Sequence, residues 1–531
     1  MESMLEWLEL WIRKCALEHS GCGHIPAALL DNLTGKKRKD HVNTDPPLLP
    51  PRVIDVGPSD GSREPYLLDN ILEARFGHYV TLSHCWGKSQ PLTTTCATYQ
   101  ERVTAMPLAT LPRTFRDAVQ VTRRLGVRYL WIDSLCTIQD SKEDWMWHCR
   151  VMHNIYGLSF LTLNASAAKD SQRGLFVDDT RPTRLQYAFK PADCPDNIFV
   201  AEYFDSQLFH LKAENYTESR AWCFQETVLA QRVAFFGPIM MGWLCNRMRA
   251  SQQDGDLGSG SGTGHRLNLL VDERFRYILW SGIVSNYSGR SLTYENDKLP
   301  ALAGIAALAQ SVMKDVYIAG HWESDLLCSL LWRMSHPESA RRPAEYRAPS
   351  WSWASMDGEL LMAEGTRFVD DASLARINSY GIQAKGDEFG EICGGYIKIL
   401  GPLLKLVSSN GGYRICDIGD RELDWHKAFQ FVETLRKSQS SLQLYFDIAE
   451  ERKVNNLWCL GITNSKVLLR MKTSANVSSA RVRCLLLTPT GDHDTFSRIG
   501  VADLDLNLST SEGYGESCTS QSIRKSLVKI V

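Results

Sequence analysis

Reactive side chains follow two apolar segments that are predicted to be strands. The segment 79–83 continues into His84 and Cys85, and the segment 127–133 ends in Asp133. Because the carboxyl ends of parallel strands meet at one edge of a sheet, we expect these side chains to share a crevice there. A thiol, an imidazole and a carboxylate in one crevice suit nucleophilic or acid–base catalysis.

Cys85 is the candidate nucleophile of this group. Neighbouring residues on an extended segment point to opposite sides, so His84 is not expected to touch Cys85, whereas Ser83 shares its side. A base for the thiol would therefore come from elsewhere, and His148 is the candidate. The alternative is that this turn is a packing element with Trp86 buried, since histidine and free cysteine are often simply buried.

His148 lies on a predicted helix that is capped by Asp144 and extends to about Tyr156. Asp144 and His148 are four residues apart, so they share a helix face and can form a pair that raises the pKa of the imidazole. Such a histidine suits general acid or base catalysis near neutral pH. The alternative is an ordinary histidine on the surface.

Two carboxylates complete the catalytic candidates. Asp133 either acts as an acid, base or ligand anchor, or caps the next loop by accepting backbone N–H groups. Glu226 shares one side of a predicted helix at 220–229 with Trp222 and Gln225. A supporting role of Glu226 is favoured over a catalytic one. The residues expected to bind a ligand in this crevice are Ser83, His84, Trp86, Gly87, Cys136, Asp140, Asp144, Trp222 and Gln225.

A second set of ligating side chains lies near the start of the chain. Cys15, His19, Cys22 and His24 are of types that bind zinc. Their spacing matches no strong zinc pattern. We therefore interpret this segment as a helix end packed on the next domain, and we expect no metal site and no bound cofactor.

Short apolar strands alternate with helices in the first half of the chain, which predicts an α/β domain with a parallel sheet at residues 75–250. A helical arm and a proline-rich linker precede it at 1–74. A Ser/Gly-rich segment at 251–264 separates it from a helical region at 265–370. Short alternating apolar segments predict a β-rich module at 371–531.

The composition narrows the classes of function. The net charge of −2 creates no overall field that favours nucleic acid or an anionic membrane, so neither is an expected partner. Fifteen cysteines without a regular framework, and a start without the features of a secretory signal, predict a reduced cytoplasmic protein. No apolar stretch approaches the about 20 residues of a membrane span. A small-molecule or nucleotide-like ligand and a protein partner remain as expected partners, with the oligomeric state open.

Several motifs follow one another along the chain, at residues 79–87, 111–118, 128–136, 152–156 and 221–226, and then at 297–302, 346–355 and 498–500. Together they resemble the fungal heterokaryon incompatibility (HET) domain proteins. The resemblance implies a role in growth arrest or cell death when genetically unlike fungal cells fuse. It also implies a flavodoxin-like parallel sheet distantly similar to TIR domains, some of which cleave NAD, so that NAD is a candidate substrate.

One position departs from the family pattern. After Asp144-Trp145 the family usually has a glutamate three residues beyond the tryptophan, and this chain has His148 there. In TIR-like NAD cleavage a helix glutamate holds the ribose hydroxyls, and a neutral imidazole cannot supply its charge. The resemblance leaves Glu143 and Glu226 as substitutes.

The sequence therefore leaves three candidate functions. The first is a HET-type protein of non-self recognition and cell-death signalling whose TIR-like crevice binds a nucleotide-like ligand. The second is an enzyme of fungal secondary-metabolite biosynthesis that uses His148, Asp133 and Cys85 for acid–base or nucleophilic chemistry. The third is an interaction scaffold without catalysis.

Overall fold

The chain forms two compact units, residues 1–268 and 269–531. The predicted division of the sequence into four segments is finer than these two units and stays a prediction. His24 and the Ser/Gly-rich segment from residue 253 onward lie outside the described residues. The computed structural model describes residues 2–19, 22–23, 25–26, 29, 31, 45–87, 92–176, 185–189, 199–203, 215–238, 240–252, 272–273, 275–362, 375–401, 403–409, 412–416, 441–454, 457–464, 479–492, 494–507 and 526–531.

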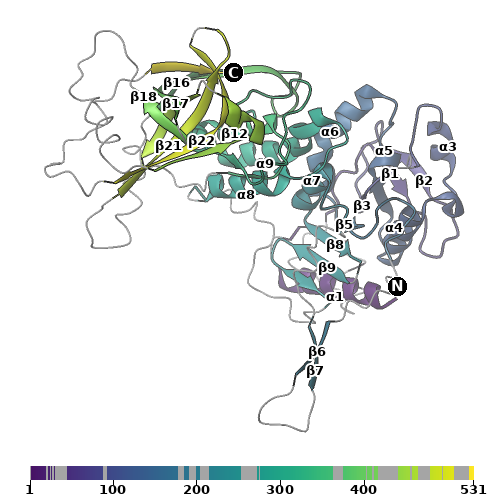
Figure 1. The fold of residues 1–531 in the computed structure, drawn as a ribbon. Coiled ribbons are helices and arrows are strands. Elements are labelled where there is room, and N and C mark those ends of the chain that lie inside the picture. Colours follow the sequence, from purple (N-terminus) through teal and green to yellow (C-terminus); the bar gives the residue numbers. More distant parts are fainter. Residues whose placement is uncertain are drawn as a thin grey trace. The chain divides into compact units, whose positions relative to one another are not determined.

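The first unit is built on an eight-stranded sheet with the order β10-β9-β8-β5-β3-β4-β1-β2 (Figure 1). Strand β3 pairs in parallel with both β4 and β5, and β5 pairs in parallel with β8. The outer pairs are antiparallel. The strands are β1 (Arg52–Asp55), β2 (Tyr66–Asp69), β3 (Tyr79–Ser83), β4 (Tyr129–Ile132), β5 (Leu161–Asn164), β8 (Arg232–Phe236), β9 (Met241–Cys245) and β10 (Arg249–Ser251).

The predicted parallel sheet is therefore confirmed for the four central strands and wrong for the edges. Central parallel strands are covered on both faces, and β3, β5 and β8 are accordingly buried at every position. Two of their polar side chains pair inside the sheet: the hydroxyls of Thr81 and Thr162 lie 2.7 Å apart. The edge strands belong to short antiparallel connections, which alternation of apolar residues does not distinguish from parallel ones.

Helices of the first unit follow the predicted order. The cap of α6 differs from the prediction, because Ser141 and not Asp144 precedes the helix, and its hydroxyl accepts the Asp144 N–H at 3.3 Å. Gly126, with φ of 68°, follows the end of α4 as expected. The elements are α1 (Glu2–Glu18), α3 (Tyr99–Thr104), η1 (Leu108–Thr110), α4 (Arg113–Arg124), α5 (Asp133–Cys136), α6 (Lys142–Gly157) and α7 (Ala221–Leu229), with a hairpin of β6 (Leu185–Phe189) and β7 (Phe199–Tyr203).

Helix α6 packs against the central strands through buried aromatic residues. The Tyr79 hydroxyl donates to the carbonyl of Ile155 at 2.7 Å. The Tyr156 ring lies edge-on to Trp131, with the ring centres 5.6 Å apart. These contacts fix the C-terminal half of α6 on β3 and β4.

The second unit contains the predicted β-rich part. Its nine-stranded sheet has the order β15-β16-β23-β22-β21-β20-β17-β18, with β19 paired to β22 (Figure 1). All its pairs are antiparallel except β22 with β23. The strands are β15 (Arg376–Ala384), β16 (Ile392–Gly401), β17 (Leu403–Ser409), β18 (Gly412–Cys416), β19 (Ser441–Phe446), β20 (Leu457–Asn464), β21 (Ser479–Pro489), β22 (Thr495–Asn507) and β23 (Ser526–Ile530).

The predicted helical region of this unit also contains short strands. Trp351 and Trp353 are buried as expected, but they do not lie on a strand. The Ser352 hydroxyl accepts the Ala354 N–H and starts a 3-10 turn there. The elements are α8 (Arg276–Ser288), α9 (Ala303–Met313), α10 (Leu326–Ser329), η4 (Glu295–Lys298), η5 (Pro300–Leu302), η6 (Glu323–Asp325), η7 (Trp353–Ser355), η9 (Ala449–Lys453), β11 (Tyr317–Ile318), β12 (His321–Trp322), β13 (Arg333–Met334) and β14 (Leu360–Leu361).

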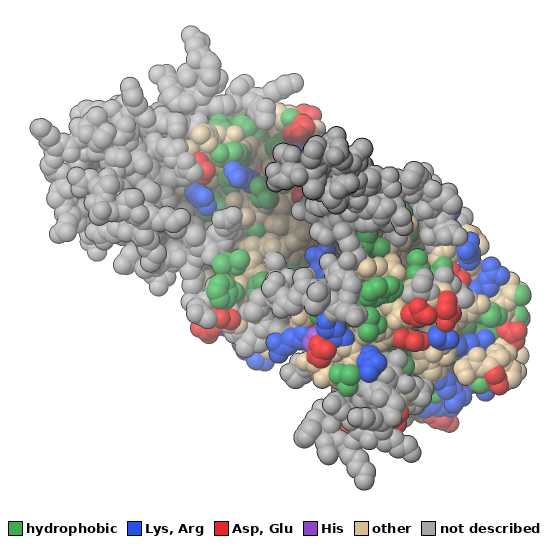
Figure 2. Space-filling view, turned by 90° about the horizontal axis from the view of Figure 1, so that it is seen from below, with side chains coloured by type: hydrophobic (Ala, Val, Ile, Leu, Met, Phe, Trp, Pro, Cys, Tyr) green, Lys and Arg blue, Asp and Glu red, His purple; other side chains and the backbone are tan. Residues whose placement is uncertain are grey.

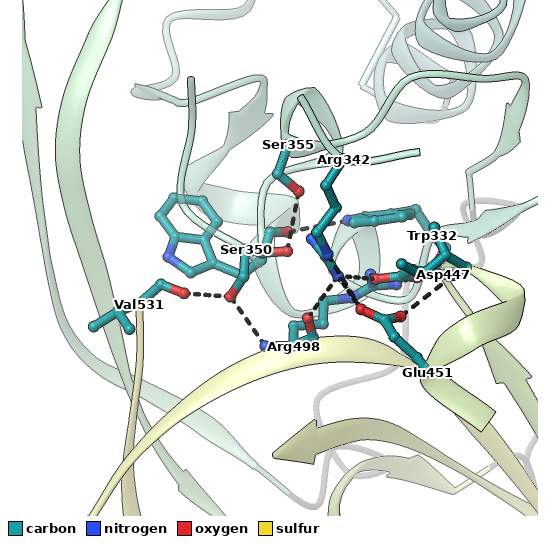
Figure 3. A network of polar contacts seen from close by, with 10 residues as sticks. Trp332, Arg342, Ser350, Ser355, Asp447, Glu451, Arg498 and Val531 are labelled. Carbon is teal, nitrogen blue, oxygen red and sulfur yellow. Dashed lines mark hydrogen bonds and ion pairs between the residues drawn. The ribbon is translucent and has the colours of Figure 1, made fainter. Parts of the chain in front are cut away.

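Arg498 on β22 joins several of these segments (Figure 3). Its buried guanidinium forms an ion pair with Asp447 and lies over the Trp332 ring, 3.3 Å from the ring centre. Its backbone N–H donates to the Ser350 hydroxyl at 3.0 Å. Arg342 binds Asp447 and donates to the Arg498 carbonyl. Two separate sequence motifs, 346–355 and 498–500, therefore meet in one polar network.

The surface carries charges of both signs. Figure 2 shows acidic and basic side chains intermixed over the described part of the visible face. None of the helices in the described part of the chain is both long and apolar enough to cross a membrane.

Candidate functional site

Helix α7 crosses the carboxyl ends of the two central strands β3 and β5. The Cys223 thiol donates to the carbonyl of His84, just after β3, at 3.9 Å. The Asn164 side chain at the end of β5 donates to the Thr227 hydroxyl at 3.3 Å. The helix therefore covers the edge of the sheet where the sequence predicts a crevice.

Glu226 on this helix is the centre of a buried polar cluster. The pKa of Glu226 is raised from 4.5 to about 7. Burial is the main cause, and the charge of Asp133 is the second. Ser83, Arg220 and Tyr156 lower the pKa of Glu226 and so limit this rise. We call Glu226, Asp133, Ser83, Arg220 and Tyr156 the Glu226 cluster.

A carboxyl group with a pKa near 7 can accept and donate a proton at physiological pH. Glu226 is six per cent exposed, so its charge is screened little by water. The side chain of Asp133 is 25% exposed and gives the cluster a boundary with solvent. The arrangement has the properties of an acid–base site with one partly open side.

Asp133 has the capping role that the sequence left open, and its role as an acid, base or ligand anchor stays a prediction. Its carboxylate accepts the Ser134 N–H at 2.7 Å, which is the expected cap of the following turn. It also accepts the indole N–H of Trp86 at 3.0 Å. The His84 ring nitrogen Nδ1 lies 3.9 Å from the carboxylate, which is too long for a hydrogen bond. Asp133 also acts on Glu226 through its charge.

Cys85 does not have the environment of an activated nucleophile. Burial raises the pKa of its thiol to about 11, although Arg220 lowers it and Glu226 raises it. The thiol is therefore protonated near neutral pH. Among the described residues, His148 is not one of the groups that act on Cys85, so the structure does not bring the predicted nucleophile and its base together.

His148 does pair with Asp144, but with the opposite effect on its pKa. Its Nδ1 lies 3.3 Å from the Asp144 carboxylate and 2.9 Å from the Asp144 carbonyl. Burial nevertheless lowers the pKa of the imidazole, and Arg52 adds to this. The predicted rise is wrong because desolvation outweighs the pair. The surface alternative is also wrong, since His148 is two per cent exposed.

The carboxylate of Asp144 contacts two other segments of the protein. It forms an ion pair with the buried Arg52 and accepts the Ile138 N–H at 2.7 Å. Arg52 also donates to the carbonyl of Cys136 at 2.8 Å. The side chain of Cys136 is fully buried, and burial raises its pKa to about 12. Asp144 therefore fastens α6 to β1 and to the loop after α5.

Other predicted ligand-binding residues also have identified contacts in the protein. Asp140 accepts the Cys96 N–H at 2.8 Å. The Trp222 ring lies edge-on to Trp145, with the centres 6.3 Å apart, and Gln225 donates to the Met152 sulfur at 3.2 Å. These contacts position α7 against α6, and a role of these residues in ligand binding stays a prediction.

The two residues at the end of the β3 turn are partly open to solvent. Trp86 is half-buried and Gly87 is exposed. Gly87 has φ of 80°, and a Cβ atom there would lie 2.5 Å from the Cβ of Asp170. The position therefore requires glycine. Together with Asp133, these residues form the open side of the Glu226 cluster.

Sequence reasoning did not select Tyr156, Arg220 and Cys223. Tyr156 lies inside a motif but resembles an ordinary buried aromatic residue. Arg220 and Cys223 precede Glu226 by six and three positions, and three-residue spacing places Cys223 and Glu226 on one helix face. That spacing was the available signal.

A cavity of about 540 Å³ lies at the other end of the central strands. Its lining comes from residues after β1 and before β4, and includes Arg63, Arg123 and Arg128. Arg63 and Arg128 both bind the buried Asp55. This cavity is separate from the Glu226 cluster, because no residue of the cluster is among those that line it.

The family described as heterokaryon incompatibility protein (HET) matches residues 79–226. The chain contains a HET domain. The match begins at the first residue of β3 and ends at Glu226, so the HET domain includes the parallel strands β3, β4 and β5 and the whole Glu226 cluster. No curated protein and no solved structure matches the chain. Strands β1, β2 and β8 to β10, together with α1, lie outside the matched segment.

Proposed function

We propose that this chain is a HET-type protein of non-self recognition and cell-death signalling whose HET domain binds a nucleotide-like ligand at the Glu226 cluster. The observation that carries the proposal is the buried carboxyl group of Glu226, with a pKa of about 7, at the carboxyl ends of parallel strands. Open α/β sheets bind ligands at such ends, where the strand order reverses.

The strand order supports this position. Among the parallel strands, the first in the chain, β3, lies between the second, β4, and the third, β5. This is the order with which a flavodoxin-like sheet begins, and its ligand site lies between the first and third strands. Glu226 is held over these two strands by the contacts of α7 with His84 and Asn164.

Glu226 takes the role that the family pattern gives to position 148. A cation placed beside Glu226, such as the nicotinamide ring of NAD, would lower its pKa and keep it ionised. The carboxylate would then stabilise the positive charge that develops on the ribose when the glycosidic bond breaks. His148 is bound to Asp144 away from Cys85 and has no carboxylate charge.

The proposal is tested by incubating the purified full chain with NAD and measuring nicotinamide release by chromatography. We expect release by the wild type, a decrease of at least tenfold in Glu226→Gln and no change in Glu143→Gln. Glu143 is the comparison because it is the other substitute that the resemblance leaves, and it is an exposed glutamate on α6. Wild-type activity that survives in Glu226→Gln would contradict the role of Glu226.

The variant His148→Glu separates two other outcomes. Release by this variant alone would mean that the NAD-cleaving role is lost in this chain. Absence of release in every variant would reject NAD cleavage, and binding of NAD by calorimetry would then decide whether the cluster is a ligand site without catalysis. A death phenotype on expression of the wild type in fungal cells, absent in Glu226→Gln, would support signalling.

An enzyme of secondary-metabolite biosynthesis is the second candidate. The imidazole of His148, in place of the usual carboxylate, favours it. In that case the proton-transferring group is again Glu226, with Asp133 as its neighbour, because the thiol of Cys85 is protonated. Loss of one specific metabolite on deletion of the gene, restored by the wild type but not by Glu226→Gln, would favour this function.

A further inference from the structure

Four side chains of metal-binding type meet at the edge of the first unit, outside the HET domain. They are Cys15, His19, Cys22 and Cys245, and their ligand atoms all lie within 4.8 Å of one another. The Cys245 sulfur is 3.4 Å from the His19 Nδ1, although 226 residues separate them. Three of the four side chains are buried, and His19 is half-buried.

The distance between the Cys245 sulfur and the His19 Nδ1 fits a tetrahedral zinc ion. Zinc binds sulfur at about 2.3 Å and histidine nitrogen at about 2.0 Å, so three sulfurs and one nitrogen on a tetrahedron lie about 3.5 to 3.8 Å apart. Three thiolates and one imidazole form a closed set of four ligands, which is typical of structural zinc. A site with four protein ligands leaves no open position for a substrate.

Local structure explains how the four positions converge. Cys15 lies in the last turn of α1, and His19 follows one turn later, where its N–H still donates to the Cys15 carbonyl at 3.2 Å. Gly23, with φ of 75°, turns the chain directly after Cys22. Cys245 is the last residue of β9, and its N–H donates to the Met248 carbonyl at 2.9 Å in the turn to β10.

The charge of such a site is balanced by a buried arginine. One zinc ion with three thiolates has a net charge of −1. Arg232 is fully buried and interacts electrostatically with both Cys15 and Cys22. Its guanidinium donates to the carbonyls of Gly23 and Phe160, each at 3.1 Å, which fixes it beside the ligand loop. A buried anionic zinc centre next to a buried cation costs less desolvation energy than either charge alone.

We propose that Cys15, His19, Cys22 and Cys245 bind one structural zinc ion that fastens helix α1 to the β9–β10 edge of the sheet. The contact has an apolar part as well, because the Trp11 ring on α1 packs on Trp243 of β9 with the centres 6.4 Å apart. The N-terminal arm is thereby part of the first unit. The expectation of no metal came from the N-terminal segment alone, where His24 was the fourth candidate, whereas Cys245 lies beyond the HET domain.

The test is the metal content of the purified full chain, measured by mass spectrometry after gel filtration. We expect about one zinc ion per wild-type chain. The variant Cys245→Ala should lose it, and Cys328→Ala should keep it. Cys328 is the matched control because it is also a buried cysteine, but in the second unit.

Two further measurements keep the result decisive if Cys245→Ala does not fold. The variant His19→Cys should keep zinc, because a thiol at this position reaches about as far as Nδ1 and four cysteines also bind zinc, whereas His19→Ala should bind it more weakly. Cobalt exchanged into the wild type should give the visible absorption bands of a tetrahedral thiolate site. Wild-type protein without stoichiometric zinc, a different metal in its place, or zinc retained in folded Cys245→Ala would overturn the proposal.

Discussion

The indole N–H of Trp86 donates to the carboxylate of Asp133 at 3.0 Å. This bond joins the turn after β3 to the first residue of α5, which follows β4. It holds one carboxylate oxygen of Asp133, while the Ser134 N–H holds the other. The tryptophan of the His84-Cys85-Trp86-Gly87 turn therefore positions the carboxylate that raises the pKa of Glu226.

Replacing Trp86 by phenylalanine removes this donor and keeps an aromatic ring. We expect the free energy of unfolding to fall by about 1 to 2 kcal/mol, because a hydrogen bond to a charged group is lost from a partly buried site. Urea unfolding followed by circular dichroism measures the change. Trp147→Phe is the control, because Trp147 is 43% exposed on α6 and should change the value by less than about 0.5 kcal/mol. Equal effects of the two variants would contradict the role of the bond.

Glu226 should make the stability of the first unit fall as the pH rises. Its pKa is 4.5 in an unfolded chain and about 7 in the folded protein, so the folded state binds the proton more tightly. Its contribution is complete below pH 4.5, decreases between pH 4.5 and 7, and is constant above pH 7. The whole change is about 3 kcal/mol.

The variant Glu226→Gln has no proton to lose, so it should lack this part of the pH dependence. The measurement is the difference in free energy of unfolding between wild type and variant at pH 5 and pH 8. We expect the variant to gain relative to the wild type at pH 8. Glu143→Gln should show the same pH dependence as the wild type. A difference that does not change with pH would mean that the carboxyl group is not shifted.

The central strands of the first unit were predictable from the sequence. Residues 79–83 and 232–236 are strands with the predicted bounds, since each is a short apolar run ended by turn residues. The direction of the edge strands was not predictable, because pairing such as that of β9 with β8 depends on the loop between them and not on periodicity. The Ser-Trp-Ser-Trp segment at 350–353 alternates like a strand, yet side-chain capping by Ser352 gives a 3-10 turn.

The chemistry of the site was less predictable, because a pKa depends on burial and on neighbours from distant elements. His148 has the expected partner in Asp144, but burial determines its pKa. From the sequence Glu226 is a minor candidate, because its pKa depends on Asp133, 93 positions earlier, and on Tyr156. The same limit applied to the zinc ligands, whose fourth member comes from β9.

The buried histidines should make the first unit less stable in acid. Burial lowers the pKa of both His84 and His148 below 6.5, so the unfolded chain binds protons more readily than the folded protein. Their contribution is present above pH 6.5 and is lost as the pH falls through their folded pKa values. This slope is opposite to that of Glu226, so single variants are needed to separate them.

His148→Gln keeps a polar side chain and removes the titration. We expect the stability of this variant relative to the wild type to increase from pH 7 to pH 5, as measured by urea unfolding at both pH values. His336→Gln is the control, since the side chain of His336 is 64% exposed in the second unit. An unchanged acid dependence in His148→Gln would show that this imidazole is not held neutral by burial.

The ion pair of Arg498 with Asp447 should be the most sensitive point of the second unit. Both side chains are buried, and Arg498 also lies on the Trp332 ring. Asp447→Ala leaves the guanidinium buried without its carboxylate, so we expect a loss of about 3 to 5 kcal/mol in the free energy of unfolding. Glu338→Gln, an exposed carboxylate that contacts His336, should cost less than about 0.5 kcal/mol. Thermal unfolding of both variants measures the difference, and similar midpoints would mean that the network in Figure 3 does not stabilise this unit.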